Sequence, residues 1–303
     1  MHDIIIVGGG PGGLTAAIYA LRAGKTVLVI EKNSFGGQIA FSPKVENIPG
    51  FSAIEGAVFA EQLTEQAMNL GADVELETVV KVEKADGIFH VSTEEGSDFP
   101  GRSVILAVGV KHRLLGLPGE EELVGNGLSF CAVCDGAFYT GQDVAMIGGG
   151  NSALQEALLL SEVCRKVTVV QNLGFFTGEK KLADALQARE NVDVHFSTLV
   201  TDYKQENGSL VGLQIKNQET GAESELSVDG AFLAVGLQPE NESFASIASL
   251  TDRGYFASGE DCCTETEGLY VAGDCRSKAI RQVVTAASDG AVAAMAACRY
   301  LDM

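Results

Sequence analysis

The sequence predicts an α/β protein with two Rossmann-like (three-layer ββα) nucleotide-binding domains, of which the first is discontinuous. A buried strand, a glycine-rich turn and a helix open the chain at residues 3–23, and the same pattern returns 140 residues later. Such an internal repeat predicts two related domains. After the second copy, the strand-like run at 231–235 is expected to lead the chain back into the first domain. We therefore expect the first domain at residues 1–112 and 242–303, and the second at 113–241.

Composition and charge argue against several classes of protein. The 303 residues carry 21 basic and 41 acidic side chains, a net charge of −20, which is unsuited to nucleic acid or an anionic membrane. No run of 18 apolar residues is present, so we expect no membrane span, and Met1–Asp3 lack the basic region of a signal peptide. Seven cysteines are an odd number and too sparse for a secreted disulfide scaffold. A cytoplasmic protein with one working cysteine pair fits these features.

The N-terminal copy carries a dinucleotide-binding fingerprint in its required context. Its parts, in order, are the strand Asp3–Val7, the turn Gly8-x-Gly10-x-x-Gly13, the helix Leu14–Ala23, the strand Lys25–Ile30 and the acid Glu31. Gly8 permits the tight turn, Gly10 lets the backbone approach a pyrophosphate, and Gly13 allows the helix to pack on the strand. Glu31 can accept hydrogen bonds from a ribose diol. The alternative is an ordinary tight turn between a strand and a helix, which the second strand and the acid disfavour.

Apolar periodicity and glycine or proline punctuation predict the other elements. Strands are predicted at Val74–Glu83, Ile88–Thr93, Ser103–Val108, Asp143–Ile147, Lys166–Val170, Val192–Phe196, Leu199–Gln205, Leu210–Asn217, Glu223–Val228, Ala231–Val235 and Leu269–Ala272. Helices are predicted at Ala57–Asn69, at Leu154–Val163 and from Arg281 to about Leu301. Lys111–Gly119 is predicted to connect the domains, with His112 and Arg113 as solvated residues of that connection.

The second copy keeps the turn and loses the acid. It has the form Gly148-x-Gly150-x-x-Ala153. Position 171 corresponds to Glu31, because both lie 23 residues after the first glycine of their turn. That position is Gln171, so a ribose diol here would lack its charged acceptor. Only the first copy therefore keeps a full dinucleotide site.

Between the two copies lies Cys131-Ala132-Val133-Cys134-Asp135-Gly136, a cysteine pair followed by an acid. Such a pair is a redox centre, half of a zinc site, or a packing feature. A structural zinc site needs four ligands, and Cys262-Cys263 has the wrong spacing to supply the second pair, so we expect no metal. Beside a dinucleotide fingerprint, the redox interpretation is favoured. Of the other cysteines, Cys275 is expected to pack, and four are expected to be structural or incidental thiols, with a second redox pair at Cys262-Cys263 as the alternative: Cys164, Cys262, Cys263 and Cys298.

The chain resembles the low-molecular-weight thioredoxin reductases over essentially its whole length. The segments that carry the resemblance are the two glycine motifs, Phe35–Gln38, Glu46–Phe51, Cys131–Gly136, Gly273-Asp274 and Arg281–Ala287. The resemblance implies bound FAD, thioredoxin as partner and a homodimer. It also implies FAD contacts from Gly8, Gly10, Pro11, Gly13, Glu31, Lys32, Gly37, Gln38, Asn47, Val80, Ala107, Gly109, Gly273, Asp274, Arg281, Gln282, Val283 and Ala286.

The resemblance assigns roles around the cysteine pair as well. Cys134 is expected to face the flavin and take its electrons, and Cys131 to exchange with thioredoxin. Asp135 is expected to act as general acid and base for these thiols. The cysteines must face the flavin and a protein in turn, so the connections at Lys111–Gly119 and Gly236–Asn241 are expected to act as hinges.

The chain departs from this family where NADPH binds. The family has His-Arg-Arg and a further Arg four residues later to hold the 2′-phosphate, whereas this chain has Asn172, Leu173 and Thr177 in place of the arginines. Each lost hydrogen bond to a charged group costs roughly 1.5–3 kcal/mol. Lys180 and Lys181 stand nearby, either as substitutes or as a solvated helix face. The chain is most similar to the ferredoxin-dependent flavin thioredoxin reductases of clostridia, which implies reduced ferredoxin and not NADPH as the electron donor.

Two other interpretations stay open, and a third is disfavoured by Cys131 and Cys134. A thioredoxin reductase with an altered NAD(P)H site would keep the chemistry and change the donor, and a non-enzymatic flavin redox sensor would signal without turnover. A ferredoxin–NADP reductase on the same scaffold normally lacks the cysteine pair. Because ferredoxins are acidic, like this chain, their docking requires a local basic patch. The candidates for that patch are Arg165, Lys166, Lys180 and Lys181.

Overall fold

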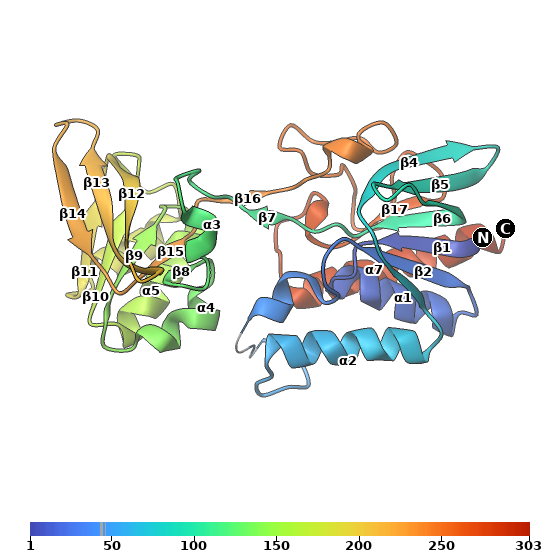
Figure 1. The fold of residues 1–303 in the computed structure, drawn as a ribbon, viewed down its shortest axis with the longest axis horizontal. Coiled ribbons are helices and arrows are strands. Elements are labelled where there is room, and N and C mark those ends of the chain that lie inside the picture. Colours follow the sequence, from blue (N-terminus) through green and yellow to red (C-terminus); the bar gives the residue numbers. More distant parts are fainter. Residues whose placement is uncertain (43–44, 46) are drawn as a thin grey trace. The chain divides into compact units, whose positions relative to one another are not determined.

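The protein is described by a computed structural model that covers residues 1–42, 45 and 47–303 (Figure 1). The chain forms two compact units, residues 1–111 with 238–303 and residues 112–237. It crosses between them twice, at β7 (Lys111–His112) and β16 (Leu237–Gln238), and these two short strands pair with each other. The predicted α/β class is confirmed, because each unit contains a sheet of parallel strands together with helices. Over the part of the chain that is described, no helix is long and apolar enough to cross a membrane.

The first unit is built on a seven-stranded sheet in the order β3-β2-β1-β6-β5-β4, with β17 also paired to β6. Its strands are β1 His2–Val7, β2 Val27–Glu31, β3 Asp73–Leu76, β4 Val79–Ala85, β5 Ile88–Thr93, β6 Asp98–Leu106 and β17 Leu269–Val271. The pairs among β1, β2, β3, β6 and β17 are parallel, and β4, β5 and β6 form an antiparallel meander. The single strand predicted at 74–83 is wrong, because β3 and β4 lie at opposite edges of the sheet.

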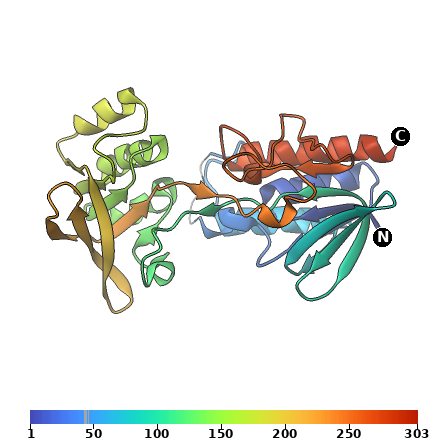
Figure 2. The same ribbon diagram turned by 90° about the horizontal axis from the view of Figure 1, so that it is seen from above.

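Helices α1 (Pro11–Arg22) and α7 (Val283–Leu301) lie side by side on one face of this sheet, and α2 (Gly56–Asn69) packs beside α1 (Figures 1 and 2). Both α1 and α7 bury many alanines, which lets the helices approach closely. A Cβ added to Gly290 would lie 2.1 Å from the carbonyl oxygen of Gly12, so the two backbones touch. Successive side chains of a strand point to opposite faces of a sheet, and in β1 the side chains of Ile4 and Ile6 pack with the helices. Ile5 therefore points to the other face of the sheet. There it packs in a second apolar layer, which includes Phe244, Ile247 and Phe256.

The second unit combines a parallel sheet in the order β11-β10-β9-β15-β8 with an antiparallel sheet β12-β13-β14. Its strands are β8 Leu128–Ser129, β9 Asp143–Ile147, β10 Lys166–Val170, β11 Val192–His195, β12 Thr198–Glu206, β13 Ser209–Asn217, β14 Glu223–Ser227 and β15 Gly230–Leu233. Its helices are α3 Glu120–Leu123, α4 Ala132–Asp135, α5 Asn151–Val163 and α6 Lys180–Gln187. The predicted strands at 143–147 and 166–170 are confirmed without a shift at either end.

The connection that follows β7 makes more side-chain contacts with the second unit than the sequence predicted. The prediction that His112 is solvated is wrong, because its ring stacks on Phe130 with centroids 4.5 Å apart, and burial lowers the pKa of this histidine. Arg113 is exposed. Further along, the buried Glu120 carboxylate accepts hydrogen bonds from three backbone N–H groups of residues 115–117 and from the Tyr203 hydroxyl at 2.6 Å. These bonds fix the segment between β7 and α3 within the second unit.

Candidate functional site

The glycine-rich turn of the first unit follows β1, at the carboxyl end of a parallel strand, where α/β folds bind ligands. Gly8 has φ +107°, and a Cβ there would lie 2.3 Å from the carbonyl oxygen of Ala107. A Cβ on Gly13 would lie 1.9 Å from the Gly8 carbonyl oxygen. Gly10 precedes α1, and Pro11 is its first residue, where a missing N–H does no harm. The turn therefore excludes side chains at Gly8 and Gly13 and leaves its backbone open to a ligand.

Glu31 ends β2 beside this turn. Its carboxylate accepts hydrogen bonds from the backbone N–H groups of Gly9 at 2.7 Å and Asn33 at 3.0 Å. The two bonds hold the carboxylate where a dinucleotide site places the ribose. The next residue, Lys32, pairs with Glu240 at 3.1 Å.

Asp274, in the short helix Gly273–Cys275 after β17, carries an unsatisfied acceptor. Its Oδ1 atom is buried and has no hydrogen-bond partner among the described residues. Burial raises the pKa of Asp274, against the opposing charges of Lys278 and Arg281. A buried acceptor without a donor is costly, and a ligand hydroxyl would satisfy it. The oxygen and the open turn therefore fit a dinucleotide with a polyol chain, as FAD is.

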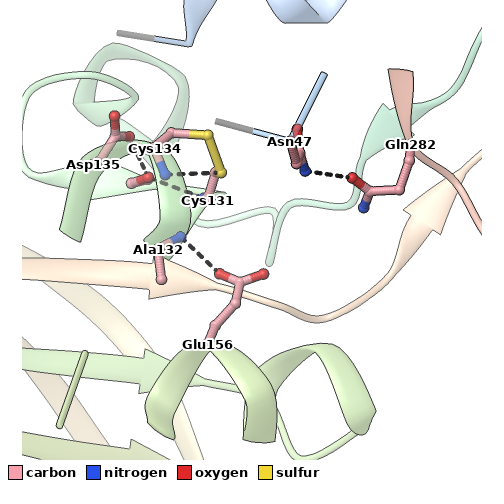
Figure 3. Close-up of a disulfide and its surroundings, with 8 residues drawn as sticks. Asn47, Cys131, Ala132, Cys134, Asp135, Glu156 and Gln282 are labelled. Atoms are coloured by element: carbon pink, nitrogen blue, oxygen red, sulfur yellow. Dashed lines mark hydrogen bonds between the residues drawn. A yellow bond between two sulfur atoms is a disulfide. The ribbon is translucent and has the colours of Figure 1, made fainter. Parts of the chain in front are cut away.

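Several other predicted contacts lie in the same unit. Arg281 donates from Nε to the backbone carbonyl of Asp274 at 3.2 Å. The Asn47 side chain donates to Gln282 Oε1 at 3.0 Å (Figure 3), and Gln282 caps α7 just before Val283. A Cβ on Gly273 would meet the Cβ of Ala286 at 3.7 Å. The structure thus brings the Gly273–Asp274 turn and the start of α7 together.

The remaining predicted contacts are more scattered. A Cβ on Gly37 would lie 3.1 Å from the Gly10 Cα, so this glycine lies against the turn. Gln38 donates its amide to the Val110 carbonyl, and Gly109 has φ +68°. Val80 is exposed on β4, at the edge of the sheet. The predicted contact segment 46–51 includes Glu46, which lies outside the described residues.

The cysteine pair forms a disulfide in the second unit, with the Cα atoms of Cys131 and Cys134 5.3 Å apart (Figure 3). Cys131 precedes the short helix α4, whose residues 132–135 carry Cys134. The backbone N–H of Cys134 donates to Cys131 Sγ at 3.2 Å. Hydrogen bonding to sulfur favours its charged form, so this geometry stabilises a Cys131 thiolate when the disulfide opens.

Asp135 is tied to this pair through a residue that sequence reasoning missed. The Ser129 hydroxyl donates to the Asp135 carboxylate and accepts from the backbone N–H of Cys131 at 3.1 Å. Ser129 is buried at the end of β8. Its position two residues before the first cysteine was the available signal, although a serine there is also typical of an ordinary turn.

Glu156 is a second missed residue at the disulfide. It projects from α5, and its Oε2 accepts a hydrogen bond from the backbone N–H of Ala132 at 3.0 Å (Figure 3). Burial raises the pKa of Glu156 to about 7, against the lowering effect of that hydrogen bond. The signal was present in the sequence, because Glu156 shares a helix face with the buried Ala153, Ala157 and Leu160.

The second glycine-rich turn repeats the backbone of the first with different side chains. Gly148 has φ +133°, and a Cβ there would lie 2.5 Å from the Ala234 carbonyl oxygen. Gln171 is buried, and its side-chain Nε2 donates to the Phe175 carbonyl at 3.0 Å. Leu173 and Phe175 are exposed apolar side chains in the following loop. The first turn thus has the carboxylate of Glu31 beside it, whereas the second has the buried amide of Gln171 bonded to its own loop.

The expected basic patch is partly neutralised. Arg165 pairs with Asp143 at 2.8 Å, and Lys166 pairs with Asp193 at 2.6 Å. Lys180 and Lys181 are exposed at the start of α6. The five cysteines outside the disulfide are free thiols, so Cys262-Cys263 does not form a second pair: Cys164, Cys262, Cys275 and Cys298 are buried, and Cys263 is exposed.

Comparison with known proteins agrees with this geometry. The profile of the pyridine nucleotide-disulphide oxidoreductases matches residues 2–290. Thioredoxin reductase of Bacillus subtilis is 36% identical over all of this chain and 95% of its own length. The bifunctional thioredoxin reductase/thioredoxin of Mycobacterium leprae is 41% identical over 99% of this chain, which spans 66% of that longer protein. The crystal structure of thioredoxin reductase from Streptococcus pyogenes superposes with a TM-score of 0.83 at 34% identity, covering 100% of this chain and 98% of the other.

These relatives are FAD-binding flavoproteins. The unsatisfied Asp274 oxygen and the glycine cradle at Gly8 and Gly13 suit that cofactor. The internal disulfide at Cys131–Cys134 suits their disulfide chemistry. By sequence and by fold, the chain therefore belongs to the thioredoxin reductases of the pyridine nucleotide-disulphide oxidoreductase family.

Proposed function

We propose that this protein reduces thioredoxin through FAD and the Cys131–Cys134 disulfide, with electrons from reduced ferredoxin and not from NADPH. When bound, FAD supplies the ability to accept single electrons and deliver them in pairs. The first unit holds FAD, and the second carries the disulfide on a domain of NADPH-binding type. Thioredoxin as substrate is supported by the relatives, one of which combines reductase and thioredoxin in a single chain.

The residues of the first unit bind and orient FAD. The turn at Gly8–Gly13 would hold the pyrophosphate, Glu31 the ribose and Asp274 the polyol chain. Arg281, whose Nε donates to the Asp274 carbonyl, would add positive charge to the site that holds the pyrophosphate. The residues that would contact FAD also include the segments around Gly37, Asn47 and Ala107 and the start of α7.

Within the second unit, the disulfide is the group that passes electrons on. Cys134 receives them, and Cys131, whose sulfur accepts the Cys134 N–H, acts as the thiolate that exchanges with thioredoxin. Asp135 gives and takes the protons of this exchange, and Ser129 holds its carboxylate next to the Cys131 backbone.

The observation that carries the choice of donor is the buried Gln171. At the corresponding position, Glu31 presents a carboxylate beside its turn, whereas Gln171 uses its amide to bind the Phe175 carbonyl. The arginines that would hold a 2′-phosphate are replaced by Asn172, Leu173 and Thr177. Because each lost charged hydrogen bond costs roughly 1.5–3 kcal/mol, the loss of several weakens NADPH binding by orders of magnitude.

An anaerobic assay with three donors tests this proposal. Reduced ferredoxin is expected to bleach the flavin and drive thioredoxin reduction, while excess NADPH or NADH does neither on the same timescale. The Cys131→Ser variant is the matched control, because it should keep ferredoxin-driven bleaching and lose thioredoxin reduction. Rapid bleaching by NADPH or NADH in stopped flow would exclude ferredoxin as the required donor and favour the altered NAD(P)H site.

Two further properties belong to this proposal. We propose a homodimer, which sedimentation of the FAD-loaded protein would test. A cytoplasmic location is supported by five of the seven cysteines being free thiols, as in proteins of reducing compartments.

A further inference from the structure

Glu156 is a half-buried carboxyl group at the disulfide to which the proposed function gives no role. We propose that Glu156 is a positioning residue of the redox site, which as a carboxylate holds the backbone N–H of Ala132, next to Cys131, and takes up a proton when the disulfide is reduced. The inference rests on the proposed function only in taking Cys131–Cys134 as the redox centre.

The hydrogen bonds around Cys131 place Glu156 in this role. Three backbone N–H groups of this segment are engaged by three different partners. The Cys131 N–H donates to Ser129, the Ala132 N–H to Glu156 and the Cys134 N–H to Cys131 Sγ. Glu156 is thus joined to the residue that directly follows the exchanging cysteine. In Figure 3 its side chain rises from α5 toward the start of α4, so two elements of the second unit meet at this bond.

Among the residues that the structure describes, no charged side chain contributes to keeping Glu156 ionised. Burial raises its pKa to about 7, and the Ala132 hydrogen bond opposes this shift. The charged or titratable side chains on α4, on residues 136–139, on β9, β10 and α6, and elsewhere on α5 are Asp135, Tyr139, Asp143, Lys166, Lys180, Lys181, Asp184 and Glu162. None of them contributes to the pKa of Glu156. Its ionisation is therefore free to respond to the charge of the cysteine pair.

Reduction of the disulfide supplies that charge. Two electrons break the S–S bond and leave a thiolate on Cys131 and a sulfur on Cys134 that takes a proton from water. A second anion beside an ionised Glu156 would be unfavourable, because like charges at a shared site raise the pKa of one of them. Glu156 then takes a second proton from water, so two protons balance the two electrons. When Cys131 is consumed in disulfide exchange, Glu156 returns to the carboxylate.

Proton uptake measured against redox state tests this inference. The FAD-loaded wild type and Glu156→Gln are equilibrated with oxidised and reduced dithiothreitol across pH, and the dithiol fraction is quantified by thiol labelling. Glu156→Gln keeps an oxygen for the Ala132 bond and cannot titrate. Above about pH 7, the wild type should take up one more proton per disulfide reduced than the variant. Glu162→Gln, on the exposed side of α5 where Glu162 pairs with Arg189, is the control and should match the wild type.

Alkylation of the reduced protein gives an independent measure. Because reduction leaves Glu156 protonated, Cys131 should react with iodoacetamide at similar rates in the reduced wild type and in reduced Glu156→Gln near pH 7, and the wild-type rate should fall below that of the variant only at higher pH, where Glu156 loses its proton. Equal proton uptake in the wild type and Glu156→Gln, or the same change in Glu162→Gln, would overturn the inference. Neither thioredoxin nor ferredoxin takes part, so a failure of the proposed function would appear separately, as absent turnover with normal proton uptake.

Discussion

Removal of the Asp289 carboxylate is expected to destabilise the first unit strongly. Asp289 lies on α7 and is 5% exposed. Arg276 donates to it twice, at 2.9 and 2.8 Å, and Lys278 donates at 2.8 Å. The backbone N–H of Gly273 adds a fourth bond at 3.0 Å. The Arg276 and Lys278 side chains are only 2% and 5% exposed, so Asp289→Ala would leave two buried cations without their carboxylate.

The magnitude follows from the cost of breaking a buried ion pair. Removing one partner of such a pair typically costs about 3–5 kcal/mol. In a unit of this size, 1 kcal/mol lowers Tm by about 2–4 °C, so Asp289→Ala should lower the Tm of the first unit by roughly 6–20 °C. Asp289→Asn keeps the shape and an acceptor for the Gly273 N–H, so its loss should be smaller.

The pH dependence of this effect has a definite sign. Burial alone would raise the pKa of Asp289, but the hydrogen bonds from Arg276 and Lys278 outweigh burial and lower the pKa. A carboxyl whose pKa is lower folded than unfolded stabilises the fold fully above its unfolded value of about 3.9. The stabilisation is lost as pH falls through the lower folded value. The Tm difference between the wild type and Asp289→Asn should therefore stay constant from neutral pH to about pH 4 and shrink below it.

Thermal unfolding followed by circular dichroism and flavin fluorescence measures this. Asp98→Asn is the matched control, because Asp98 pairs with His90 at 2.9 Å and is half exposed. A surface change of this kind alters stability by less than about 0.5 kcal/mol. If Asp289→Ala changed Tm no more than Asp98→Asn, the buried-pair reasoning would be refuted.

Three further predictions concern the cofactor and the redox site. Gly13→Ala places a Cβ 1.9 Å from the Gly8 carbonyl oxygen, so the purified variant should lack flavin absorbance, and a full flavin content would contradict the tight turn. Cys131→Ser should retain FAD and lose all thioredoxin reduction, whereas a pure redox sensor would show no turnover to lose. Ser129→Ala removes the hydroxyl that donates to the Asp135 carboxylate, so kcat with thioredoxin should fall roughly tenfold or more at unchanged FAD content. An unchanged kcat and pH profile would show that Asp135 does not depend on the Ser129 hydrogen bond.

Much of the architecture was predictable because strong local signals agree with it. The strands at 143–147 and 166–170 are apolar runs between glycine-rich or charged segments, and both ends of each were predicted correctly. The boundary between β3 and β4 was missed because the break at Glu77-Thr78 contains neither glycine nor proline. The two strands differ in their pairing partners, because Val74 pairs with Val29 of β2 and Val79 with Thr93 of β5. Pairing between segments that are separated in sequence cannot be read from the residues at the break.

The site was predictable where chemistry is carried by a motif and not where it depends on packing. The cysteine pair, its acid and the glycine turns have fixed spacings, and the change from Glu31 to Gln171 could be found by counting. Ser129 and Glu156 act through backbone N–H groups of the cysteine segment, and the sequence signals for them, a serine near a turn and an acid on a helix face, are too common to single them out. His112 was misjudged because the Phe130 ring that covers it belongs to a different element.

The backbone contact between Gly12 and Gly290 has a consequence for how the protein is made. During synthesis, β1 and α1 leave the ribosome before the second unit, and α7 leaves it after the second unit. The second unit is contiguous and can fold once residue 237 has emerged, whereas the first must wait for the C-terminal helix to cover α1. Until α7 packs against it, the alanine-rich face of α1 stays exposed to solvent. The glycine-rich turn that precedes α1 is thus completed late in folding, after the second unit has been synthesised. Chains truncated before α7 should therefore bind chaperones or be degraded by proteases.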